Sequence, residues 1–160
     1  MKELDLTLSY TFKQLEVQLI HYYYFEGSYF DLGLNNDGGT QLEATIKYTM
    51  PQMPLQFVVS TNVAGCDPDP ETGDRAYSTY LEANYTWEWE NPGVKLQAVV
   101  GATPWRGMYS GEYKSGICNI SARADKEWTV GNATVNLQLC PMFSPTFEEF
   151  NWCVGLGVEF

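Results

Sequence analysis

Four acidic side chains lie close together in one polar segment: Asp67, Asp69, Glu71 and Asp74. Carboxylate oxygens are the ligands that Ca²⁺ accepts in proteins. Pro68 and Pro70, however, interrupt the spacing that an EF-hand loop requires. We therefore expect a solvated surface loop here, and the sequence predicts no metal site and no cofactor.

The chain has one histidine, His21. It falls on the apolar side of an alternating pattern, near the outer end of a predicted strand. A hydrolase needs a nucleophile or a water molecule that is activated by a base. Because the one histidine points away from the polar side, where such a site would form, we do not expect an enzyme.

The four cysteines have neither a CxxC motif nor a Cys/His spacing, which argues against a zinc site. They are Cys66, Cys118, Cys140 and Cys153. In the strand arrangement derived below, Cys140 and Cys153 lie opposite each other in the last hairpin, which makes a disulfide between them our hypothesis. Cys66–Cys118 is a weaker second pair, and four reduced thiols are the alternative. The mass shift on reduction and alkylation separates these cases.

The final eleven residues alternate strictly between apolar and small or polar side chains. One face carries Phe150, Trp152, Val154, Leu156, Val158 and Phe160, and the other carries Asn151, Cys153, Gly155, Gly157 and Glu159. A transmembrane β-strand needs about 9–11 residues with apolar side chains toward lipid and polar ones toward the lumen. This segment has that length and that pattern.

Similar alternation recurs along the rest of the chain. The further predicted strands cover about residues 4–12, 15–25, 42–50, 55–63, 77–89, 94–103, 119–125 and 134–139. The connections are alternately short, at 13–14, 50–54, 90–93 and 129–132, and long, near 26–39, 64–75, 105–116 and 142–149. Short turns on one side and long loops on the other are typical of outer-membrane barrels.

The composition narrows the class of protein further. A net charge of -11 and a pI of about 4.3 exclude a general nucleic-acid binder, because few cations are available to neutralise phosphates. The sequence has no apolar run of about 18 residues, so it predicts no transmembrane helix. The fold expected is all-β: an antiparallel, up-and-down transmembrane β-barrel that forms a single domain over residues 1–160, with about nine strands.

Single-chain bacterial barrels have an even number of strands. Met1-Lys2-Glu3 leads directly into a strand without a charged and then apolar leader. We therefore expect the chain to be the C-terminal part of a larger even-stranded barrel, of about twelve strands in all, whose signal peptide and first strand or strands are absent.

The alternation also predicts which charged side chains line the lumen of such a barrel. They are Glu16, Glu43, Lys47, Glu82, Glu88, Lys95, Arg123 and Asp125. Acidic groups outnumber basic ones in this set, so we expect a channel with a mild preference for cations.

Four segments resemble porins of Gram-negative outer membranes whose substrates are uncharacterised: Ser60–Asn62, Asp74–Tyr80, Thr103–Tyr109 and Gly155–Phe160. The resemblance implies an outer-membrane location, contact with the lipid bilayer and passive diffusion of small solutes. The C-terminal pattern also resembles the signal that the barrel-assembly machinery reads. The residues of that signal are Trp152, Val154, Leu156, Val158 and Phe160.

Two other functions are compatible with the same strands. The first is a structural or adhesive barrel without an open pore, in which Tyr22, Tyr24 and Tyr80 fill the interior. The second is a soluble β-barrel or sandwich that binds a hydrophobic ligand. Solubility without detergent separates the soluble protein from the other two classes, and conductance separates a channel from a plugged barrel.

Overall fold

Alternating sequence produces nine β-strands in the computed structural model, which describes residues 3–24, 35–36, 38–90, 93–111 and 114–159. The strands are β1 (Glu3–Phe12), β2 (Leu15–Tyr24), β3 (Thr40–Thr49), β4 (Leu55–Gly65), β5 (Thr79–Trp89), β6 (Val94–Thr103), β7 (Gly116–Val130), β8 (Ala133–Ser144) and β9 (Glu149–Glu159). Among these residues no helix is long and apolar enough to cross a membrane.

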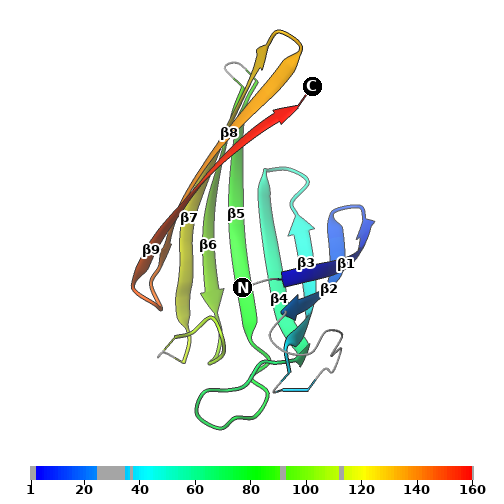
Figure 1. Ribbon diagram of the computed structural model, residues 1–160, viewed down its shortest axis with the longest axis vertical. Coiled ribbons are helices and arrows are strands. Elements are labelled where there is room, and N and C mark those ends of the chain that lie inside the picture. Colours follow the sequence, from blue (N-terminus) through cyan, green and yellow to red (C-terminus); the bar gives the residue numbers. More distant parts are fainter. Residues whose placement is uncertain (1–2, 25–34, 37, 91–92, 112–113, 160) are drawn as a thin grey trace.

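The nine strands form one antiparallel sheet in which each strand pairs with its neighbours in the sequence. The sheet curls into a trough, and its edge strands β1 and β9 lie apart (Figure 1). No pairing between β1 and β9 occurs in the described residues, so the sheet is open. The predicted all-β, antiparallel, up-and-down architecture is thus confirmed, whereas a closed, membrane-spanning barrel stays a prediction.

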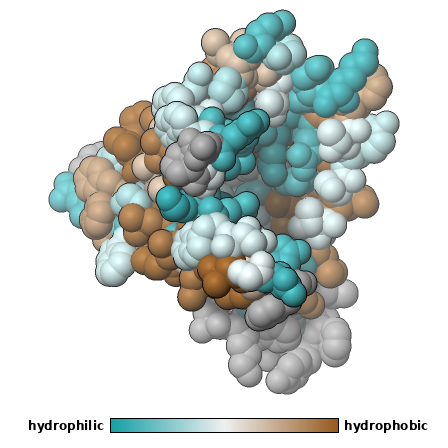
Figure 2. Space-filling view, turned by 90° about the horizontal axis from the view of Figure 1, so that it is seen from above, coloured by the Kyte–Doolittle hydropathy of each residue, from teal (hydrophilic) through white to brown (hydrophobic). Residues whose placement is uncertain are grey.

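The pleat separates apolar from polar side chains. Large apolar residues occupy the convex face and remain open to their surroundings; the most exposed include Leu8 (72%), Leu156 (71%) and Trp152 (69%). Viewed from above, hydrophilic residues surround the recess, and many of the hydrophobic ones lie toward the outside (Figure 2). The register of neighbouring strands places apolar side chains opposite each other, as in the pair Leu137 and Leu156.

The best-buried side chains, in contrast, are polar. Asn62, Thr40, Ser78 and Ser110 are the largest side chains that are essentially inaccessible in the described part of the chain. In water-soluble proteins, Ile, Val, Leu and Phe occupy such positions, and polar residues are mostly exposed. The distribution here is therefore inverted.

Strands β7 and β8 are longer than the sequence pattern predicts. β7 continues through Trp128 to Val130, so that only Gly131 and Asn132 remain for the turn, and Gly131 has a φ of 63°. β8 continues through Pro141, which lies opposite Trp152 in the register. Proline lacks the amide hydrogen that a ladder uses, and this is why the predicted strand stopped too early.

Candidate functional site

The polar concave face of the sheet is the candidate site, and the eight predicted lining residues lie along it. Their positions follow from the register, in which Glu16 is opposite Lys47, Glu88 opposite Lys95, and Lys95 opposite Asp125. The face has two ends. The short turns lie at one end of the strands, and the longer connections lie at the other.

Ion pairs gather toward the short-turn end. We call the following six residues the charged belt: Glu16, Lys47, Glu88, Lys95, Arg123 and Asp125. The Lys95 amino group lies 2.8 Å from Glu88, and Arg123 Nε lies 2.9 Å from Asp125. Glu16 and Lys47 are a looser pair at 3.9 Å. Each cation of the belt therefore has an acidic partner.

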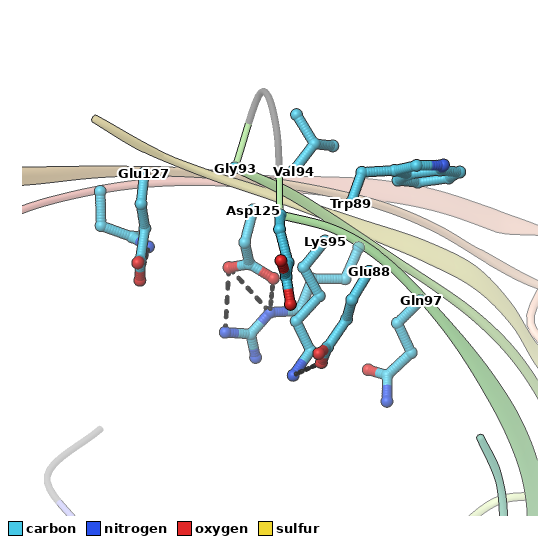
Figure 3. Close-up of a pocket in the computed structure, with 11 residues that line it drawn as sticks. Glu88, Trp89, Gly93, Val94, Lys95, Gln97, Asp125 and Glu127 are labelled. Carbon is cyan, nitrogen blue, oxygen red and sulfur yellow. Dashed lines mark hydrogen bonds and ion pairs between the residues drawn. The ribbon is translucent and has the colours of Figure 1, made fainter.

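A hollow of about 540 Å³ opens beside the charged belt. Glu88, Lys95 and Asp125 point into it, whereas Trp89 and Val94 lie on the other side of the sheet (Figure 3). Neighbouring amides extend the network, as Gln138 Nε2 donates to Asp125 at 3.1 Å. Since half or more of the Lys95 and Glu88 side chains is exposed, this end is open and hydrated.

The long-loop end carries a different arrangement, which we call the tyrosine cluster. Its members are Tyr22, Glu43, Tyr80, Glu82 and Tyr109. The Glu43 carboxylate, 8% exposed, accepts hydrogen bonds from Thr45 Oγ1 at 2.8 Å, from Tyr109 Oη at 3.4 Å and from Tyr22 Oη at 3.5 Å. Tyr80 Oη donates to Glu82 at 2.8 Å. Hydroxyl groups and the Asn84 amide, not cations, therefore face these two carboxylates.

Tyr80 and Tyr109 join the two carboxylates into one assembly. Their ring centroids lie 5.5 Å apart with the planes tilted by 47°, which is a favourable aromatic geometry. Burial, reinforced by the charge of Glu43, raises the pKa of the Tyr109 phenol. The phenol therefore keeps its proton at neutral pH and serves as a donor.

Tyr80 can lie against β6 only because residue 101 is glycine. A Cβ atom at Gly101 would overlap the hydroxyl group and ring of Tyr80. Asn119, on the next strand, donates through Nδ2 to Tyr80 Oη at 2.9 Å. Its Oδ1 atom is buried and has no partner among the described residues.

The connection between β6 and β7 carries Tyr109 across the trough to Glu43 of β3. The two residues that meet there are 66 positions apart in the sequence. Three kinds of contact hold the connection. Trp105 Nε1 donates to Tyr77 O at 3.0 Å, the Met108 amide donates to Ser78 Oγ at 2.8 Å, and Arg106 forms an ion pair with Glu71. Thr146, in the connection between β8 and β9, also donates through Oγ1 to Tyr109 O at 3.1 Å.

The acidic segment after β4 differs from the solvated loop that the sequence predicts. Asp67 is only 2% exposed, and its carboxylate accepts from the Ser78 amide at 2.7 Å and from Ser78 Oγ at 2.5 Å. Asp69 caps its own turn by accepting from the amides of Glu71 and Thr72, and these bonds hold the pKa of its carboxyl below the usual range. The prediction was thus wrong for Asp67, because the serine partner eleven residues away was not foreseen.

The other singled-out residues lie as follows. His21 lies among leucines of the convex face, beside Leu6, Leu19 and Leu42, as the alternation predicts. Cys140 and Cys153 are directly opposite in the register of β8 and β9, both as thiols. Their oxidation stays a prediction, as does the pairing of Cys66 with Cys118.

Trp152, Val154, Leu156 and Val158 share the exposed convex face of β9. The fifth residue of the predicted assembly signal, Phe160, lies outside the described residues. Within the described ranges, no group of three or more His, Cys, Asp or Glu side chains could hold a metal ion.

No family model, curated protein or solved structure matches this chain. The resemblance to porins therefore stays a prediction. Any functional conclusion depends on the arrangement of the residues themselves.

Proposed function

We propose that the protein is a membrane-embedded β-barrel channel of the outer membrane, through which small solutes diffuse passively. The observation that carries this proposal is the inverted distribution of side chains: the apolar face is outside, and the buried groups are polar. In a bilayer, apolar side chains face lipid, and the lumen of a barrel is polar. Strands of ten residues or more fit the length that spanning requires.

The same observation argues against a soluble carrier of hydrophobic ligands. Such a carrier would turn its apolar face toward an enclosed cavity. Here the concave face is lined with charged and amide side chains, and the leucines of β1 and β9 point to the opposite side. Open to water, an apolar face of this extent would promote aggregation.

A pair of adjacent substitutions tests the membrane location. Val99 and Val100 are neighbours in β6 on opposite faces, and Val100, on the convex face, is 47% exposed. In a lipid-facing position Val100→Arg should destabilise the folded protein by about 2–4 kcal/mol. Val99→Arg, toward the hydrated side near Asn84 and Ser121, should cost clearly less.

The measurement is urea unfolding in lipid vesicles, with heat-modifiable gel migration as a check on folding. Equal costs for the two arginines would contradict the membrane location. Spontaneous solubility of the unmodified protein without detergent would contradict it as well.

A plugged barrel is the second candidate, and one observation favours it. Tyr22, Tyr80 and Tyr109 cross the trough at the long-loop end, together with the connection that follows β6. Conductance across planar bilayers separates the two candidates. Stepwise currents would support a channel, and a protein that inserts without current would support the plugged barrel.

A further inference from the structure

The ion pairs of the concave face divide the eight predicted lining residues into two groups. The three cations are Lys47, Lys95 and Arg123, and each lies within 4 Å of one acid of the charged belt. Two carboxylates remain. Glu43 and Glu82 have no lysine, arginine or histidine nitrogen within ion-pair distance in the described part of the chain.

These two carboxylates also share a location. Both belong to the tyrosine cluster, at the end of the trough that the β6–β7 connection crosses, and Tyr109 and Tyr80 join them. Glu43 is 8% exposed, whereas Glu88 of the charged belt has a side chain that is 65% exposed. Salt screens buried charges far less than exposed ones.

From this division we infer that Glu43 and Glu82 determine ion selectivity, and that they favour cations over anions. The inference depends on the proposed channel function. The belt contributes little, because its charges cancel in pairs and are open to water. Among the eight predicted lining residues, the acids without a cationic partner thus lie at one end of the trough.

The hydroxyl groups around the carboxylates fit this role. Tyr22, Thr45 and Tyr109 donate to Glu43 without neutralising it. No cation therefore cancels the negative charge at the end of the trough that the β6–β7 connection crosses. A lysine or arginine in the same place would cancel it.

The experiment measures reversal potentials in a KCl gradient for reconstituted full-length protein. Glu43→Gln and Glu82→Gln keep the size and a hydrogen-bond acceptor and remove one charge each. Glu88→Gln combined with Lys95→Met is the control, because it removes one complete ion pair of the belt and leaves the net charge of the lining unchanged. We expect each of the first two variants to lower the ratio of K⁺ to Cl⁻ permeability by about twofold, and the control to change it less.

The control effect should also vanish in about 1 M salt, where the screening length falls to about 3 Å. Should Glu43→Gln fail to insert, Glu82→Gln carries the test, because this side chain is less buried. Two results would overturn the inference but not the proposed channel function. One is a non-selective current in the unmodified protein, and the other is an equal change of selectivity in all three variants. Absence of current would instead overturn the channel and the inference together.

Discussion

The charged side chains at the two ends of the concave face have different partners and different exposure to water. At the short-turn end, acids and bases alternate across neighbouring strands and stay in contact with water. At the long-loop end, the carboxylates of Glu43 and Asp67 are covered, and these two and Glu82 meet hydroxyl or amide donors. Exposed ion pairs contribute little to stability, but a covered carboxylate depends on each of its donors. We therefore expect the loop end to dominate stability, and substitutions there to have the larger effects.

The largest effect is expected at Asp67. Asp67→Ala removes the acceptor of two hydrogen bonds, so the amide and the hydroxyl group of the fully buried Ser78 lose the carboxylate to which they donate. We expect a loss of about 4 kcal/mol in the free energy of unfolding, because hydrogen bonds to a charged group are removed and buried donors are left unsatisfied. Urea unfolding in vesicles measures it.

Asp74→Ala is the matched control, because Asp74 is exposed and its backbone hydrogen bonds with Asp69 and Thr72 survive the substitution. A loss of stability in Asp67→Ala no larger than that in Asp74→Ala would contradict the expectation that covered carboxylates dominate the stability of the loop end.

Gly101→Ala should have the next largest effect. The added methyl group would overlap Tyr80, which must then leave its place between Glu82 and Asn119. Overpacking of this kind costs about 1–3 kcal/mol. Unfolding in urea gives the change in stability.

Gly155→Ala in β9 provides the contrast. There the new methyl group approaches only the side chain of Gln138, at 3.3 Å, and that side chain can move. We expect a change of less than about 0.5 kcal/mol, as for other surface substitutions. Equal destabilisation by both alanines would show that Tyr80 is not closely packed.

The smallest effect is expected in the charged belt. The double variant Glu88→Gln with Lys95→Met removes an ion pair whose side chains are 65% and 52% exposed. Its free energy of unfolding should change by less than about 1 kcal/mol, and by still less at high salt. A loss comparable with that of Asp67→Ala would contradict the expectation that the long-loop end contributes more to stability than the short-turn end.

Alternation of side chains was sufficient to predict the sheet. It predicted the nine strands, their neighbours, the four short turns and the face of the sheet on which the eight predicted lining residues lie. These features depend on residues that are close in the sequence, and a period of two is a local signal. The ends of β7 and β8 were missed, since charged and proline residues there resemble a turn.

The loop end could not be predicted in the same way. Tyr109 reaches Glu43, and Asp67 reaches Ser78, through loops whose course no periodic pattern describes. One sequence signal was present but not interpreted: Gly101 interrupts an otherwise apolar and polar alternation in β6. A strand glycine often marks the close approach of another group, and here that group is Tyr80.

The up-and-down order of the strands also has a kinetic consequence. Every contact between strands joins consecutive elements, so the sheet can form hairpin by hairpin with little loop-closure cost. The links of Tyr109 to Glu43 and of Met108 to Asn62 span 66 and 46 residues. Contacts of high sequence separation form slowly. The sheet should therefore assemble first, and closure of the loop end should be the late event that determines how long the native state persists.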